Sequence, residues 1–283
     1  MKAYFRKHTV LFHIFAAILW IWGLSLLFVI LWGILISLHG EMEYILNPRT
    51  IFPKKFRFSN YAVAIRTLAY NNALYPMMVV NSVWFSFGAT FLRVAVTTMC
   101  AYAVSKYEFR GKKLFYGFIV LQLMLPVYGQ TVANYKLLTR LGLVNTPLYL
   151  LALGAGHGMY FLIMHSYFEN LSKSYMEAAR IDGANDFVIF LRIMLPMAKP
   201  LIFAMFIAIL IGVWNDFTTP LLYLDNYPTL ASGLYRYKIV AAYTLNTPVY
   251  FAGILLSALP MAALFITFNK TLMQNLTIGG IKG

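Results

Sequence analysis

The chain has 283 residues, of which 61% are hydrophobic, 17% are aromatic and only 11% are charged. Because soluble domains carry about 25% charged residues, this composition excludes an ordinary soluble domain, a disordered chain and a disulfide-rich scaffold. It indicates a protein with several membrane-spanning helices. The net charge of +14 does not indicate nucleic-acid binding, since the basic residues lie mainly between long apolar stretches, where they orient helices and meet anionic lipid. We therefore expect membrane lipid, and no nucleic acid, among the partners.

Six apolar stretches follow a basic N-terminal tail, residues 1–9. Each is long enough to cross a bilayer core of about 30 Å, which takes about 20 helical residues. The first stretch is too long for a signal peptide and no clear small-residue cleavage site follows it, so we expect it to be retained. The sequence predicts an all-α membrane protein in which residues 10–283 form one domain. The predicted spans cover residues 10–38, 77–104, 115–134, 148–168, 201–224 and 250–269.

Lysine and arginine residues set the predicted orientation. With six spans both termini share a side, and that side carries more Lys and Arg than the other. Because positive loops stay in the cytoplasm, we expect both termini there. Several basic residues between the first and second spans weaken this contrast.

The loop between the fourth and fifth spans, residues 169–199, is unusually long and patterned. Glu177 follows Ser174 at the spacing of a capping box, which predicts the start of a short helix. Gly183 suits a left-handed stop for that helix, and Asn185 can cap a second one. The sequence therefore predicts a helix–turn–helix outside the membrane.

The second helix of this loop would be apolar nearly all round, from Phe187 to Leu195, with Pro196 ending or kinking it. Such a helix is unlike one that faces water on every side. Either it rests on the membrane interface or on its own bundle, or it is a docking element for a cytoplasmic partner. The residues by themselves favour neither interpretation.

The spacing of residues in this loop resembles a known signature. Glu-Ala-Ala at 177–179 is followed after three residues by Gly183, and nine further residues lead to Ile193, Leu195 and Pro196. This pattern resembles the signature loop of permease subunits of bacterial ABC importers. The resemblance implies that the loop supplies a coupling helix that docks on an ATP-hydrolysing subunit. The coupling residues it implies are Glu177, Ala178, Ala179, Asp182, Gly183, Ile193, Leu195 and Pro196.

Further segments resemble the maltose-type branch of these carbohydrate importers, and specifically its shorter permease subunit. They are EYILNP at 43–48, FPKKFRFSNYAVAI at 52–65, the second span with its following basic turn, WNDF at 214–217 and the C-terminal NLTIGGIKG. The resemblance implies the type I ABC importer permease fold, with six spans and a cytoplasmic helix–turn–helix coupling loop between the fourth and fifth.

The same resemblance implies a function and a set of partners. The chain would form the pathway for a carbohydrate, such as an oligosaccharide, with a second homologous permease in the bacterial plasma (inner) membrane. Two ATPase subunits would bind the loops, and an extracellular or periplasmic sugar-binding protein would deliver the sugar. The chain would be non-catalytic and hold no cofactor, since ATP and Mg²⁺ would bind the partner ATPase.

Polar residues within two of the predicted spans are candidates for the pathway or a gate. Arg93 lies in the middle of the second span, where a charge commonly faces a cavity or a partner; the alternative is a pair with a polar group on a neighbouring helix. Trp214, Asn215 and Asp216 fall in the outer half of the fifth span. They could line the pathway, or pack helices together, since Asn makes interhelical hydrogen bonds in lipid.

A secondary transporter and a membrane enzyme are the two alternative classes of function. A self-contained secondary transporter would show paired repeats and ionisable residues near the midplane, but only Arg93 is clearly charged there. A membrane enzyme would need an acid–base or metal constellation, whereas the five histidines are scattered and the P-loop pattern is absent. We expect no catalytic residue and no metal site.

Overall fold

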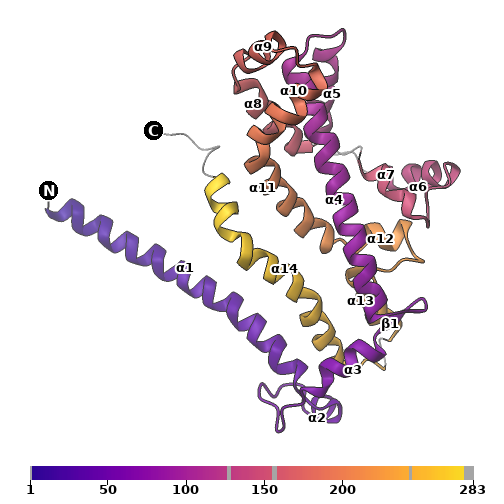
Figure 1. The fold of residues 1–283 in the computed structure, drawn as a ribbon. Coiled ribbons are helices and arrows are strands. Elements are labelled where there is room, and N and C mark those ends of the chain that lie inside the picture. Colours follow the sequence, from indigo (N-terminus) through magenta and orange to yellow (C-terminus); the bar gives the residue numbers. More distant parts are fainter. Residues whose placement is uncertain (1, 126–128, 155–157, 242–243, 277–283) are drawn as a thin grey trace. The chain divides into compact units, whose positions relative to one another are not determined.

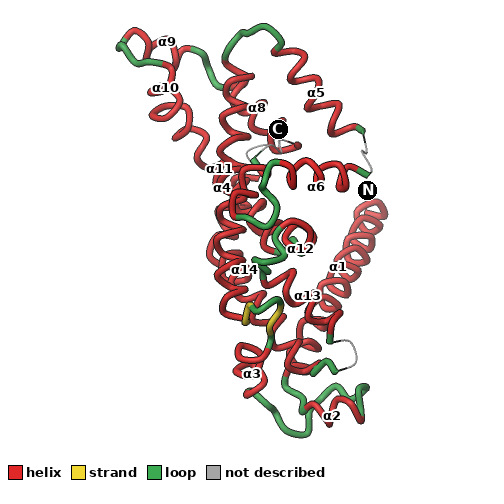
Figure 2. The backbone as a smooth tube through the Cα atoms, turned by 90° about the vertical axis from the view of Figure 1, so that its right-hand side faces the viewer, coloured by secondary structure: helices red, strands yellow, loops and turns green. Residues whose placement is uncertain are grey.

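The computed structural model describes residues 2–125, 129–154, 158–241 and 244–276 (Figure 1). Nearly all of the regular structure in these ranges is helical (Figure 2), which confirms the all-α class. The chain divides into two compact units. The first comprises Met1–Tyr70 and Leu234–Leu259, and the second comprises Asn71–Gly233 and Pro260–Gly283.

The first unit joins the N-terminal helix to a short helical segment by buried hydrogen bonds. The Asn60 side-chain amide donates to the carbonyls of Ser37 and His39, at 2.7 Å and 2.8 Å. The hydroxyls of Ser37 and Tyr61 lie 2.8 Å apart. The elements are α1 (Lys2–Ser37), α2 (Glu41–Leu46), α3 (Ser59–Thr67), β1 (Ala69–Tyr70), the part of α13 (Leu230–Val240) from Leu234, and the part of α14 (Thr247–Leu276) up to Leu259.

The second unit is built around α4, which packs against α8 and α11. Its elements are β2 (Ala73–Leu74), α4 (Tyr75–Lys106), α5 (Lys112–Met124), α6 (Gln130–Arg140), the 3₁₀-helix η1 (Pro147–Tyr149), α7 (Leu150–Leu153), α8 (Gly158–Asn170), α9 (Ser174–Ile181), α10 (Asp186–Ile189), the π-helix η2 (Phe190–Met194), α11 (Leu195–Trp214), α12 (Thr218–Tyr223) and the remaining parts of α13 and α14. Small buried residues such as Ala89, Thr97 and Ala101 line α4, and such residues let helix backbones approach closely.

Within the described residues, four helices are long and apolar enough to cross a membrane: Leu11–Ser37, Tyr75–Lys106, Asp186–Trp214 and Thr247–Asn269. They correspond to the first, second, fifth and sixth predicted spans. A fifth candidate is the pair Pro147–Leu153 and Gly158–Asn170, which bends by 57° and corresponds to the predicted span 148–168. Residues 155–157 of that span lie outside the described residues.

The predicted third span, 115–134, is two helices in the structure. Helix α5 ends at Met124 and α6 begins at Gln130, after Gly129 in the left-handed conformation at φ +81°. Residues 126–128 of the predicted span lie outside the described residues. The count of six spans therefore stays a prediction. The inclusion of residues 277–283 in the single predicted domain and the cytoplasmic location of both termini also stay predictions.

The fifth predicted span differs most from the structure. The predicted range was 201–224, but the helical run begins at Asp186 and ends at Trp214. Pro196 does not end this run, and it lies directly after the π-helix Phe190–Met194, where the hydrogen-bond pattern of the helix changes. The second helix of the loop is thus continuous with the span.

We predict that Asn60→Ala destabilises the first unit by about 1–3 kcal/mol, because two buried carbonyl groups lose their donor. The measurement is thermal unfolding of the purified chain in detergent, and Asn47→Ala, at an exposed position, is the matched control. Equal unfolding curves for the two variants would contradict the role assigned to these hydrogen bonds.

Candidate functional site

The loop that follows α8 contains the helices α9 and α10, which lie at one end of the second unit (Figure 1). Helix α9 begins at Ser174, as predicted, but the predicted capping box is wrong. Lys173 is the N-cap and makes no side-chain cap, while Ser174 is already the first helical residue. The Ser172 hydroxyl instead accepts a hydrogen bond from the Ser174 amide at 3.2 Å.

The turn between α9 and α10 confirms the glycine stop. Gly183 has φ +81°, a conformation that residues with a side chain rarely adopt. Its amide donates to the Arg180 carbonyl at 3.0 Å, and the Ala184 amide donates to the Ala179 carbonyl at 2.9 Å. These two bonds form a Schellman motif, which satisfies carbonyl groups left open at the end of α9.

Helix α10 begins with the cap that the sequence predicts. The Asn185 side chain accepts a hydrogen bond from the Val188 amide at 2.9 Å. An ion pair of 2.9 Å between Arg180 and Asp186 crosses the turn. The two side chains are 50% and 56% exposed, and an exposed ion pair contributes little stability. The backbone bonds and the cap therefore set the angle between the two helices.

The loop has a buried side and an exposed side. Met176, Ala179 and Ile189 are buried and hold the loop on the unit. Three large apolar side chains are exposed, and we call Tyr175, Ile181 and Phe187 the exposed apolar face: Ile181 is 87% and Phe187 69% exposed. Contiguous exposed apolar surface marks interaction sites, and these three side chains come from the two helices of one loop.

The predicted coupling residues fall into two groups. Glu177, Ala178, Asp182 and Gly183 are exposed on α9 and its turn, whereas Ala179 is buried. The other three lie one helix further on: Ile193 in η2 and Leu195 and Pro196 at the start of α11. The structure therefore places Glu177, Ala178, Asp182 and Gly183 on the exposed side of the loop. The second group lies where the loop continues into α11.

Two side chains outside α9 and α10 make hydrogen bonds that connect the ends of the loop to neighbouring helices. The sequence motifs did not indicate them. The Lys106 ammonium at the end of α4 donates to the Leu171 carbonyl. The Tyr167 hydroxyl on α8 donates to the Met197 carbonyl of α11 at 2.6 Å. No sequence signal marks them, since each contact joins elements far apart in the chain.

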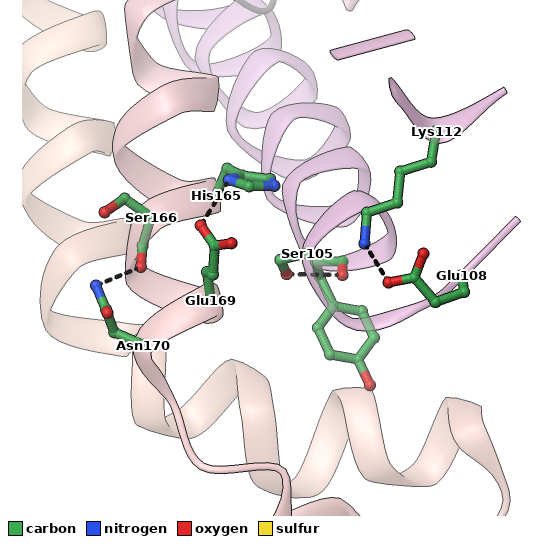
Figure 3. A network of polar contacts seen from close by, with 8 residues as sticks. Ser105, Glu108, Lys112, His165, Ser166, Glu169 and Asn170 are labelled. Carbon is green, nitrogen blue, oxygen red and sulfur yellow. Dashed lines mark hydrogen bonds and ion pairs between the residues drawn. The ribbon is translucent and has the colours of Figure 1, made fainter. Parts of the chain in front are cut away.

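Polar contacts also cover the nearby ends of α4, α5 and α8 (Figure 3). The Lys112 ammonium lies 2.8 Å from the Glu108 carboxylate and holds the pKa of that carboxyl below its ordinary value. On α8 the His165 ring lies 3.6 Å from the Glu169 carboxylate. The first pair joins the start of α5 to the connection that precedes it, whereas His165 and Glu169 are four residues apart on α8, a spacing that places side chains next to one another.

The candidate pathway residues make mostly local contacts. The Asn215 side chain donates to the Ile211 carbonyl of its own helix at 2.8 Å, and the Asp216 carboxylate accepts from the Thr219 amide at 3.0 Å. Trp214 is buried, and Asn215 follows it as the C-cap of α11. Both hydrogen bonds are local to the end of α11 and the turn that follows it, so the pathway role and the packing role both stay predictions.

Arg93 is half-buried on α4. Both Arg93 and Asp216 lie within electrostatic range of the Tyr149 hydroxyl. The Tyr149 ring stacks on Tyr223, with centroids 4.9 Å apart and an angle of 15°. The sequence did not predict this aromatic pair, because η1 and α12 are distant along the chain.

The fold matches that of a solved transporter. A crystal structure of a bacterial ABC transporter involved in the import of the acidic polysaccharide alginate aligns with a TM-score of 0.79. The match covers 94% of this chain and 97% of that chain, at 22% sequence identity. The fold is therefore the permease fold of type I ABC importers.

The chain belongs to the family of binding-protein-dependent transport system inner membrane components, which matches residues 4–274. One relative is the arabinooligosaccharides transport system permease protein AraQ of Halalkalibacterium halodurans, 32% identical over 254 residues that cover 88% of this chain and 89% of the relative. Another is the diacetylchitobiose uptake system permease protein NgcG of Streptomyces coelicolor, 29% identical over 93% of this chain and 86% of the relative. Membership of this family favours the importer over the secondary transporter.

We predict that Gly183→Val displaces α10, because a β-branched residue in the left-handed conformation costs roughly 1–2 kcal/mol. No neighbouring atom lies within 4 Å of an added Cβ, so the cost comes from the backbone and not from crowding. Hydrogen exchange of the amides in 174–194 should rise. Gly183→Asn is the control, since Asn tolerates this conformation; equal exchange in both variants would contradict the turn assignment.

Proposed function

We propose that the chain is the permease subunit of an ATP-driven ABC importer for a carbohydrate such as an oligosaccharide. The observation that carries the proposal is the exposed apolar face, presented by a rigid helix–turn–helix in a chain of this family. The substrate class comes from the relatives, whose names refer to arabinooligosaccharides and diacetylchitobiose.

In this proposal the chain lines the pathway together with a second homologous permease. Two ATPase subunits bind ATP and Mg²⁺ and dock on the 177–196 loops, and a sugar-binding protein outside the cell delivers the substrate. The chain holds no cofactor and hydrolyses nothing. It lies in the inner membrane with both termini in the cytoplasm, and lipid surrounds it.

The mechanism follows from differential binding. Closure of the ATPase subunits on ATP moves the docked loop, and the continuous helix from Asp186 to Trp214 carries that movement into the span. A conformational change of this kind requires ATP and the loaded binding protein to bind one state more tightly than the other.

For the pathway, we propose Arg93 and Asp216 as contacts for the substrate and Trp214 with Asn215 as part of a gate. The opposite charges of Arg93 and Asp216 near Tyr149 support the first assignment, because a sugar hydroxyl can accept from a guanidinium and donate to a carboxylate. The helix end after Trp214 supports the second, because a helix end can change direction.

The first experiment is a pull-down of the tagged chain from native membranes in mild detergent, with subunit stoichiometry by mass. Recovery of one related permease and two ATPase copies is the expected result. Recovery of this chain alone, active in uptake by proteoliposomes without ATP, would overturn the proposal.

We predict that Ile181→Asp lowers recovery of the ATPase at least tenfold, since a buried charge without a partner costs several kcal/mol at an interface. Val240→Asp is the control, because Val240 is also an exposed apolar residue, at 77%, on α13. An ATPase yield that is the same for both variants would show that Ile181 lies outside the docking surface.

We predict that Arg93→Met reduces uptake about tenfold or more, because a hydrogen bond to a charged group contributes about 1.5–3 kcal/mol. The loss should be larger for uronate-containing oligosaccharides than for neutral ones, since a guanidinium in the pathway attracts a carboxylate. Arg140→Met, at the exposed end of α6, is the control. Equal loss for both classes of sugar would indicate a structural role for Arg93.

A further inference from the structure

Tyr102 lies at the meeting point of the loop and the bundle. It is in the last turns of α4 and is 5% exposed. Its ring centroid lies 4.9 Å from that of Phe190 and 5.5 Å from that of Phe168. Phe190 is the first residue of η2 and Phe168 is near the end of α8, so one ring contacts two other elements at the base of the loop.

The contact with Phe190 falls where the long helix is irregular. Residues Phe190–Met194 form a single π-helical turn, the π-turn, between α10 and α11. Such turns are rare in proteins as a whole, and many of those that occur are at functional sites. Pro196 follows within two residues and has no N–H to donate to the Arg192 carbonyl. The hydrogen-bond pattern of the continuous helix therefore changes at the turn that Tyr102 contacts.

Helix α4 has no direct covalent connection to the loop. Helix α8 leads into α9 and α10 leads into α11, so those two spans follow any displacement of the loop through the backbone. Helix α4 follows through its side-chain packing against α8 and α11. At the base of the loop that packing includes Tyr102, and the Lys106 ammonium donates to the Leu171 carbonyl. Of these, only Tyr102 touches the π-turn.

The ring of Tyr102 is itself held in place. The Tyr107 ring packs edge-on against it, with centroids 5.6 Å apart and an angle of 86°. The two hydroxyls lie 3.3 Å apart, which is a long hydrogen bond. Packing of the aromatic ring therefore contributes more to this contact than the hydroxyl group does.

We propose that Tyr102 is a positioning residue that transmits displacement of the loop to α4, so that the span moves with the ATPase. This inference rests on the proposed function. The ring stands between the π-turn and the end of α8, and its removal weakens the contact of α4 with the π-turn. ATP hydrolysis then continues while transport falls.

The test compares three variants of the full complex in proteoliposomes. Tyr102→Leu removes the ring, Tyr102→Phe keeps it, and Tyr75→Leu removes an equally buried ring, 4% exposed, at the opposite end of α4. The quantity measured is ATP hydrolysed per molecule of radiolabelled arabinotriose, diacetylchitobiose or maltotriose imported, whichever the wild-type complex imports best. We expect Tyr102→Leu to raise this ratio at least threefold, and the other two variants to stay within a factor of about 1.5 of wild type.

A second readout separates this inference from the proposed function. Hydrogen exchange of the amides in 186–194, measured on the purified chain without partners, should rise in Tyr102→Leu and not in Tyr75→Leu. Faster exchange with a wild-type ATP-to-sugar ratio would overturn the proposal, because the contact would then be structural only. If the wild-type complex imports sugar without ATP, the proposed function fails, whereas a raised ratio confined to Tyr102→Leu supports both.

Failure of Tyr102→Leu to assemble would not end the test. Phe190→Leu removes the same ring contact from the side of the loop, and the same ratio is then measured for that variant. A raised ratio supports the proposal, and a wild-type ratio overturns it.

Discussion

The close packing of α4 against α8 and α11 is the constraint on which the second unit depends. Lipid is as apolar as the helices, so burial of apolar surface does not drive them together, and fitting surfaces must do so. Small residues such as Ala89 and Ala101 on α4 allow that approach. The packing brings the ends of α4 and α8 and the start of α11 together, and the loop between α8 and α11 packs against these helix ends.

The loop combines a rigid part with an irregular join. Its two helices are fixed to one another by the Schellman bonds at Gly183 and the Asn185 cap, both of which are local and need no distant support. The join to α11 passes through a π-turn next to Pro196. A rigid element on an irregular join suits the transmission of movement, because the element keeps its shape while its orientation changes.

Local chemistry explains what could be predicted from the sequence. Gly183 as a helix stop and Asn185 as a cap act through their own backbone positions, so both predictions were correct. The start of α9 was also correct, although the helix has no side-chain cap. The end of the fifth span was wrong because apolar residues continue past Trp214 into α12, and hydropathy does not register the helix end between them. Tyr102 and Tyr149 were missed because their partners are distant in the chain and only tertiary packing brings them together.

The exposure of Ile181 and Phe187 has a consequence for how the cell makes this protein. In the proposed docking, a newly inserted chain without its partner presents an isoleucine that is 87% exposed, and exposed apolar surface favours aggregation. Synthesis in excess of the partner would therefore yield aggregated or degraded chain. The exposed apolar side chains therefore require that this chain and its partner be produced in matched amounts.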